Sequence, residues 1–284
     1  MEDKALAWMN NYNTINTRNG AKSAYNSFSE YLENMDIGID EFIESLKVSE
    51  DEKYIKLNQY QRSLSTMPAS IKKNYAFIKS YLRVCHAIKL DNDDQKQYIK
   101  FKPIQKINRE PLLKSVIKLL CQNSNQLHKT FYLIQASSGM RASESINLKK
   151  EDFDFKADPI KVTIPASLTK TQTERITFIS KEAKSNLDKI GVEYFKPKNL
   201  NMIEQYFYKL RRICGLIDRY PNTPNYKTNI HSFRAFFRTE SGKINQDFGE
   251  SILGHQGYLR QYIRLTDDDL RAYYTKLEPK LKIF

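Results

Sequence analysis

Residues 160–180 read IKVTIPASLTKTQTERITFIS and change the periodicity of the chain. Apolar and polar residues alternate in two short runs, Ile160–Ile164 and Ile176–Phe178. Alternation with a period of two is typical of strands, and the polar tip between the runs, which contains Lys170, favours a β-hairpin or two strands of a small sheet. The flanking segments have helical periods. We therefore expect a mainly α fold with a small β-sheet or hairpin.

Helical segments surround this hairpin in the second part of the chain. We expect Pro111 to start one helix and a second helix, over residues 127–138, to end at Gly139, because glycine readily takes the left-handed conformation that closes a helix. Beyond the hairpin, Ser180 is expected to cap a helix, and Thr266, which three aspartates follow, is expected to cap the last one. These signals predict a mostly helical second domain.

The first part of the chain has helical periodicity in its main segments. Thr17 and Asp40 are the expected N-caps of two helices, and Pro68 suits the first turn of a third. The polar stretch DNDDQKQYIKFKPIQKINRE follows, contains Pro103 and lacks helical periodicity, so it is expected to be a linker. The expected division is a helical bundle over 1–90, a linker over 91–110 and a second domain over 111–284.

Positive charge is concentrated in the second part of the chain. The 284 residues carry a formal net charge of +13. Residues 1–105 hold 15 Lys and Arg against 14 Asp and Glu, whereas residues 106–284 hold 31 against 19. A basic domain of this kind favours a polyanionic partner, most simply nucleic acid, over a surface that is charged only for solubility.

The composition argues against several other classes of protein. Hydrophobic residues make up 40% and aromatic residues 12% of the chain, which is typical of a folded protein and not of a disordered one. The sequence has no run of about eighteen apolar residues and no apolar leader, so we expect a soluble cytoplasmic protein. The cysteines Cys85, Cys121 and Cys214 lie far apart in apolar helical patterns, and we expect no metal site from them.

Four short segments of the second domain carry side chains suited to phosphate chemistry. They are SSGMRASESINL with Arg141, TKTQTERITF with Lys170, HSFRAFFRTE with His231 and Arg234, and LGHQGYLRQYI with His255 and two tyrosines. His231 and Arg234 are one helical turn apart and would share a helix face. Each motif alone is common on protein surfaces. The occurrence of all four in this order within one domain is what favours a site.

These side-chain types match the needs of phosphodiester transfer without a metal ion. The planar forks of two arginines could hold one phosphate from two sides, and an imidazole adds a donor or a proton carrier. A lysine on a flexible tip could protonate a leaving oxygen, and a tyrosine could attack the phosphorus. The sequence shows neither the paired carboxylates of a two-metal nuclease nor a GxxxxGK(S/T) loop for nucleoside triphosphates.

Together, SGMRASE, HSFR and LGHQG resemble the tyrosine recombinases, the phage integrase, Xer and Cre-like family. The resemblance covers roughly residues 106–284 and extends more loosely to the first domain, which looks like the family's helical core-binding domain. The closing stretch YIRLTDDDLRAYYTKLEPKLKI looks most like integrases of archaeal or bacterial mobile elements. The resemblance implies a catalytic domain that binds double-stranded DNA at specific recombination sites, assembles as a tetramer on DNA and uses no metal or cofactor.

The resemblance also implies roles for the residues of these motifs. Arg141 would bind the scissile phosphate, and His231 and Arg234 would complete the grip. His255 would hydrogen bond to the phosphate or assist proton transfer. Glu144, the acidic residue of RASE, would brace the site without taking part in the chemistry.

The two remaining roles fall to a lysine and a tyrosine. Lys170 would protonate the 5′ leaving oxygen, although Lys161 in the first strand is an alternative. Tyr262 would attack and form a 3′-phosphotyrosyl linkage; it lies seven residues beyond the Gly-His histidine, a shorter spacing than in many family members. Tyr258 leaves the chain little length to turn back toward the phosphate, and the Tyr273-Tyr274 pair is expected to pack within the last helix.

Other functions share parts of this pattern. A type IB topoisomerase or a telomere resolvase would use the same chemistry, although the chain is short for either. A non-catalytic DNA-binding relative, such as a regulator or an architectural protein, would keep the fold. The apolar tail that ends in Leu281, Ile283 and Phe284 could pack on its own domain or on a neighbouring copy. The leading prediction is an integrase of a mobile element or virus that acts at the nucleoid or in a host cell.

Overall fold

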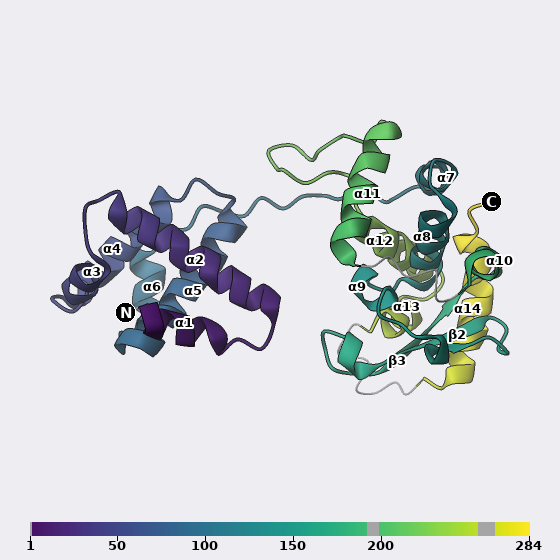
Figure 1. Cartoon of the computed structure of the whole chain (residues 1–284), viewed down its shortest axis with the longest axis horizontal. Coiled ribbons are helices and arrows are strands. Elements are labelled where there is room, and N and C mark those ends of the chain that lie inside the picture. The colour runs from purple at the N-terminus through teal and green to yellow at the C-terminus, as the bar shows by residue number, and fades with distance from the viewer. Residues whose placement is uncertain (1, 192–198, 255–264) are drawn as a thin grey trace. The chain divides into compact units, whose positions relative to one another are not determined.

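The computed structural model describes residues 2–191, 199–254 and 265–284, and the chain divides into two compact units (Figure 1). The first unit spans residues 1–107 and the second spans residues 108–284. Each unit has its own apolar core. In the three described ranges, no helix combines the length and the apolarity needed to cross a bilayer.

Helices build the first unit. They are α1 (Glu2–Asn10), α2 (Ile15–Glu33), α3 (Ile39–Ser45), α4 (Glu50–Ser63), α5 (Pro68–His86) and α6 (Asn92–Tyr98). Pro68 occupies the first turn of α5, as predicted. The predicted cap Thr17 is wrong, because Thr14 carries the same hydroxyl one turn earlier and accepts the capping hydrogen bond. Asp40 is also not a cap. It lies in the first turn of α3 behind Gly38, where its charge complements the helix dipole.

The stretch predicted to be a linker begins with a helix. Asp91 caps α6 by accepting hydrogen bonds from two backbone N–H groups of its first turn. Ile99 follows this helix and is buried in the core of the first unit, and Phe101 packs against the same core. The expectation of a non-helical segment was therefore wrong for Asn92–Tyr98, because the cap and this anchoring compensate for a weak apolar period.

Helices also dominate the second unit. They are α7 (Lys114–Gln122), α8 (Gln126–Ser138), α9 (Ala142–Ser145), α10 (Lys181–Ile190), α11 (Leu200–Ile213), α12 (His231–Gly242), α13 (Gln246–Leu253) and α14 (Asp267–Leu281), with 3-10 turns η1 (Lys150–Asp152) and η2 (Ala166–Leu168). The central helix is α8, in which every residue from Thr130 to Ser138 is buried. It ends at Gly139, as predicted, with a left-handed φ of 64°.

Two further helix starts follow the sequence signals and one does not. Ser180 caps α10, and Thr266 caps α14 in a capping box, as expected. Pro111 does not start a helix, because α7 begins three residues later. The backbone N–H of Glu110 donates to the Tyr220 hydroxyl at 3.0 Å, which holds the chain before α7 against a loop of the same unit.

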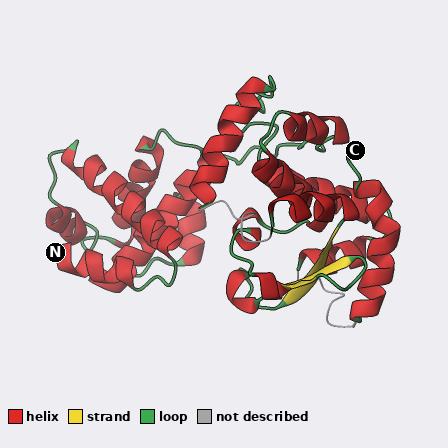
Figure 2. Ribbon diagram, turned by 45° about the vertical axis from the view of Figure 1, so that its right-hand side comes forward, coloured by secondary structure: helices red, strands yellow, loops and turns green. Residues whose placement is uncertain are grey.

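A small sheet lies among these helices (Figure 2). In the described part of the chain its strands run antiparallel in the order β1 (Phe153–Asp154), β2 (Ile160–Ile164) and β3 (Arg175–Ile179). The predicted hairpin is β2 and β3, whereas β1 was missed because two residues show no readable period. Ile164 lies opposite Arg175 and Val162 opposite Thr177, and these four residues are buried. The polar residues Arg175 and Thr177 of β3 are thus buried, like the apolar Phe178 of the same strand.

The last helix packs back onto the second unit. Tyr273 and Tyr274 of α14 are buried, which confirms their expected packing role. Leu281 and Ile283 belong to the same core cluster. Of the two alternatives for the apolar tail, the structure has the tail packed on its own unit.

Candidate active site

The turn after α8 places the first arginine of the predicted site. A Cβ on Gly139 would lie 2.5 Å from the Phe237 ring and 2.8 Å from the Leu253 side chain. Both the left-handed backbone and the close packing therefore require glycine at this position. The turn carries Arg141 to the edge of the core, where its side chain is 29% exposed. The backbone before Arg141 is thus fixed by core packing, while its side chain remains partly accessible to solvent.

Glu144 holds Arg141 at two points. Its carboxylate accepts a hydrogen bond from the Arg141 backbone N–H at 2.7 Å and another from the guanidinium Nη1 at 2.8 Å. Glu144 itself is fully buried on the one-turn helix α9. The acidic residue of RASE therefore fixes the direction of the Arg141 side chain, which is the geometry that a bracing residue needs.

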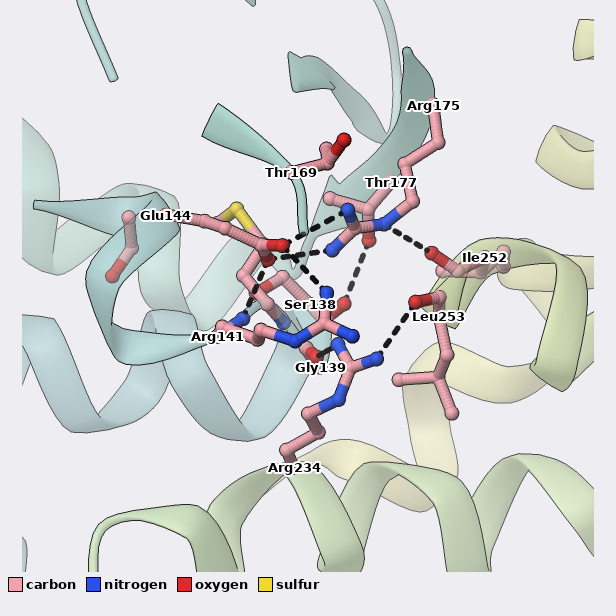
Figure 3. A network of polar contacts seen from close by, with 12 residues as sticks. Ser138, Gly139, Arg141, Glu144, Thr169, Arg175, Thr177, Arg234, Ile252 and Leu253 are labelled. Atoms are coloured by element: carbon pink, nitrogen blue, oxygen red, sulfur yellow. Dashed lines mark hydrogen bonds and ion pairs between the residues drawn. The ribbon is translucent and has the colours of Figure 1, made fainter. Parts of the chain in front are cut away.

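Arg175, at the start of β3, completes this ion pair and was not predicted (Figure 3). Its guanidinium donates to both carboxylate oxygens of Glu144, at 3.1 and 2.6 Å, and its Nε donates to the Ile252 carbonyl at 3.1 Å. Burial alone would raise the pKa of Glu144, but the hydrogen bonds and charges of Arg175 and Arg141 outweigh it and lower that pKa. The carboxylate is therefore ionised at neutral pH.

Two signals in the sequence point to Arg175. It occupies the position of β3 that faces Ile164 across the hairpin, so the strand period places it on a buried face. A buried glutamate in RASE also requires a cationic partner, because buried carboxylates are almost always paired. The strand was predicted from its apolar residues Ile176 and Phe178 alone, and this pattern assigns no role to Arg175.

Arg234 and His231 come from the first turns of α12. Arg234 is buried, and its guanidinium donates to the carbonyls of Gly139 and Leu253, the latter at 2.7 Å. These bonds join the turn before Arg141 to the end of α13. His231 is the first residue of α12 and is exposed. The predicted pair thus lies on one helix, with the arginine directed into the cluster.

Positive charge exceeds negative charge in this cluster. Among the described residues, the guanidinium groups of Arg141, Arg175 and Arg234 gather near a single buried carboxylate, that of Glu144 (Figure 3). Burial and then repulsion by Arg141 and Arg175 lower the pKa of Arg234 to about 10, against the opposing attraction of the Glu144 and Glu250 carboxylates. An anion beside Arg141 and Arg234 would relieve this repulsion. The electrostatics therefore favour binding of a phosphate-sized anion.

Lys170 lies in the connection between β2 and β3 and is exposed. The hydroxyl of the preceding Thr169 is buried and accepts from the Thr173 backbone N–H at 3.0 Å, which ties the base of the loop. Within the described ranges, no hydrogen bond or ion pair joins Lys170 to the arginine cluster. The alternative, Lys161, pairs with Asp267 of α14 at 3.1 Å and does not lie at the loop tip.

Three predicted residues, His255, Tyr258 and Tyr262, lie outside the described residues. The chain approaches them at Gly254, which closes α13 with a left-handed φ of 70°. A Cβ on Gly254 would lie 2.6 Å from Cδ of Arg175. Arg175 therefore packs against the residue immediately before His255.

The other two tyrosines that were considered are fixed in the core. Tyr274 is fully buried and donates its hydroxyl hydrogen to the Ser137 carbonyl at 2.8 Å. Tyr273 donates to the Ser241 carbonyl at 2.7 Å, and burial raises its pKa to about 12. Both phenols are thus held by backbone carbonyls inside the core, which favours a packing role over the role of nucleophile.

Comparisons with known proteins agree with this fold. A family model described as the phage integrase family matches residues 110–256, just over half of the chain. No curated protein matches the sequence. A lambda integrase tetramer bound to a Holliday junction aligns with a TM-score of 0.64 and 17% identity, over 94% of this chain and 78% of that chain.

Two further solved structures are similar. XerH site-specific recombinase, in a post-cleavage complex with a palindromic difH substrate, aligns with a TM-score of 0.58 and 15% identity, over 90% of this chain and 78% of that chain. The Tn1549 transposon integrase, in complex with circular intermediate DNA, aligns with a TM-score of 0.53 and 14% identity, over 79% and 84%. At these identities the likeness establishes a shared fold: mainly α with a small antiparallel sheet.

Proposed function

Because the chain belongs to the phage integrase family of tyrosine recombinases, which break and rejoin DNA at specific sites, we propose that its arginine cluster holds the scissile phosphate. The observation that carries this proposal is the pair Arg141 and Arg234. Arg141 is held by the buried Glu144 carboxylate, and Arg234 is held by two backbone carbonyls, before any substrate is present. Charge that is fixed in advance stabilises a phosphoryl transition state without reorganising during the reaction.

The remaining groups of the proposed site surround that phosphate. Arg141 and Arg234 stabilise the charge that develops on the non-bridging oxygens. His231, which is exposed at the start of α12, and His255 hydrogen bond to the phosphate or carry protons. Glu144 takes no part in the chemistry and keeps Arg141 in place.

In the proposed reaction Tyr262 is the nucleophile and Lys170 is the general acid. The Tyr262 oxygen gives its proton to one of the two histidines and forms a bond to phosphorus while the bond from phosphorus to O5′ breaks, and Lys170 gives a proton to O5′. The products are a 3′-phosphotyrosyl linkage and a free 5′ hydroxyl. Attack of a 5′ hydroxyl from a second duplex reverses these steps and joins the strands, and no metal ion or cofactor takes part.

The two units divide DNA binding between them in this proposal. The second unit, which has the larger excess of basic residues, is the catalytic domain, and the helical first unit is the core-binding domain. Lysine and arginine contacts to phosphates dominate affinity, so binding weakens steeply with salt. Four copies assemble on two duplexes. The protein acts where its DNA lies, in the cytoplasm at the nucleoid or in the host cell of a mobile element or virus.

The test is a covalent-adduct assay on DNA that the protein itself selects. Duplexes are enriched from a randomised pool by binding to the Tyr262→Phe variant and are rebuilt with a nick beside the cleavage position, so that cleavage becomes irreversible. The wild-type chain is expected to form an adduct that resists denaturing electrophoresis. Tyr262→Phe should form none, and Tyr258→Phe should form it as wild type does.

Two results would contradict this proposal. An adduct formed by Tyr262→Phe would move the nucleophile elsewhere. Tight, salt-sensitive binding of the selected DNA without any adduct from the wild-type chain would favour a non-catalytic DNA-binding protein. Relaxation of supercoiled DNA without strand exchange between two sites would instead indicate a topoisomerase.

A further inference from the structure

Arg175 joins three segments that the proposed function requires to meet (Figure 3). Through Glu144 it reaches the segment of Arg141, with two hydrogen bonds to the carboxylate. Through Nε it holds the Ile252 carbonyl, and its Cδ packs against Gly254 at the end of α13. Through its own backbone it begins β3, the strand that follows the Lys170 loop.

We propose that Arg175 is a positioning residue for strand cleavage, one that sets the relative placement of Arg141, the Lys170 loop and the end of α13 at Gly254. This inference rests on the proposed function. Arg175 does not touch DNA in this role, because its side chain is only 5% exposed. It acts through Glu144 and through the end of α13.

The hydrogen-bond geometry argues for positioning over bulk stability. All three nitrogens of the Arg175 guanidinium donate, two to one carboxylate and one to a carbonyl. A buried ion pair is often no more stable than apolar side chains of the same volume, because both charges must lose their water. Such a pair does fix direction, because the planar fork matches a carboxylate in one orientation only.

The contact with Gly254 makes the arrangement stereochemically tight. The left-handed Gly254 leaves no room for a Cβ, which would lie 2.6 Å from Cδ of Arg175. A shift of the Arg175 side chain therefore disturbs the end of α13 at Gly254. The same shift would release the Glu144 carboxylate and with it Arg141. A displacement of about 1 Å at reacting groups can lower a rate by about a hundredfold.

Four variants test the proposal, together with the single variant Arg141→Lys, which is needed to interpret the double variant, and one matched control. Arg175→Met keeps the side-chain length without the charge, Arg175→Lys keeps the charge without the fork, and Glu144→Gln keeps the shape of the carboxylate without its charge. The fourth is the double variant Arg175→Lys/Arg141→Lys, which is read against its two single variants. The control is Thr177→Val, which removes a buried hydrogen bond from the same strand, to the Ser138 carbonyl at 2.7 Å, without touching Glu144.

The measurements separate positioning from folding and from DNA binding. Thermal unfolding and the dissociation constant for the selected duplex are measured first, and then the single-turnover rate of adduct formation at saturating protein. We expect Arg175→Lys to bind DNA within about threefold of wild type and to cleave about a hundredfold more slowly. Thr177→Val, at an equal or larger loss of stability, should cleave at close to the wild-type rate.

The double variant gives a second readout that a structural role would not move. If Arg175 acts through Arg141, the loss in Arg175→Lys/Arg141→Lys is smaller than the product of the two single losses. Wild-type cleavage by Arg175→Lys, a loss matched by Thr177→Val at equal stability, or losses that multiply would each overturn the proposal. All rates are relative to the wild-type adduct on the same duplex. An absent wild-type adduct therefore contradicts the proposed function and not this inference alone.

Discussion

The cationic groups of the proposed site fall into two regions with opposite properties. The side chains of Arg175 and Arg234 are buried, and each donates to backbone carbonyls or a carboxylate. Lys170 is exposed on a loop, and only the base of that loop is tied, through Thr169. Groups that must hold charge in one place are thus fixed in advance, whereas the group proposed to deliver a proton lies exposed on a loop.

Removal of an arginine from the buried region should have the largest effect. Arg234→Ala is expected to lower the adduct-forming rate by about a thousandfold or more, because a preorganised donor to the phosphate is lost. It also leaves the carbonyls of Gly139 and Leu253 without this donor, which should lower the free energy of unfolding by about 1–3 kcal/mol. Single-turnover cleavage and denaturant unfolding measure the two effects.

Arg141→Ala is the matched variant for this comparison. Its side chain is partly exposed and bonds only through Glu144 among the described residues, so we expect a similar loss of cleavage with a smaller loss of stability. Equal stability losses in the two variants would remove the distinction between the arginine that supports the turn and the one that faces the substrate.

Loss of the loop lysine should affect chemistry without affecting the fold. Lys170→Ala is expected to slow adduct formation by about a hundredfold or more and to leave the unfolding midpoint unchanged, because the side chain is exposed. A substrate with sulfur in place of the bridging O5′ should restore most of the rate, because a thiolate leaves without a proton. The exposed Lys149→Ala is the control and should match wild type. A defect that sulfur does not relieve would assign Lys170 to binding.

The pH dependence of stability should separate the site from the rest of the unit. The lowered pKa of Glu144 stabilises the folded state above its ordinary value of 4.5, and this contribution is lost as pH falls below that value. Burial lowers the pKa of His128, a residue of α8 that packs against α11, from 6.5 to about 4, so between pH 6.5 and 4 the unfolded state binds a proton that the folded state does not. Stability should therefore fall by about 1–3 kcal/mol from pH 6.5 to 4 through His128.

Two variants show which residue causes the pH dependence of stability in each of these two pH ranges. His128→Gln should flatten the dependence between pH 6.5 and 4, and Glu144→Gln should flatten the part below 4.5. Denaturant unfolding at a series of pH values gives both. An unchanged upper window in His128→Gln would show that the buried imidazole, which stacks on Tyr206 at 3.5 Å, does not control it.

Local chemistry made several features predictable from the sequence, and tertiary partners decided the others. Gly139, Pro68 and Thr266 were predicted correctly because a left-handed turn, a first helical turn and a capping box depend on neighbouring residues alone. Thr17 was wrong because Thr14 offers the same hydroxyl. The helix at Asn92–Tyr98 was missed because its anchoring residues lie outside its own weak pattern.

The candidate site divides in the same way. Arg141, His231 and Arg234 were predicted from short motifs, and the structure brings the two arginines into one cluster. Arg175 was missed because its importance comes from Glu144 and from the end of α13, which are distant in sequence. An arginine on the buried face of a strand is a usable signal when a glutamate elsewhere also needs a partner.

The smallest expected effects concern the buried tyrosines of α14. Tyr274→Phe and Tyr273→Phe each remove one hydroxyl that donates to a carbonyl, and each should lower the free energy of unfolding by about 1 kcal/mol. Adduct formation should remain within about twofold of wild type, since neither phenol lies near the arginine cluster in the hydrogen-bond network. Loss of the adduct in either variant, with unfolding still cooperative, would make a buried tyrosine the attacking group. The second unit would then have to open before it could cleave DNA, and the contrast between a fixed arginine cluster and an exposed proton donor would no longer describe this site.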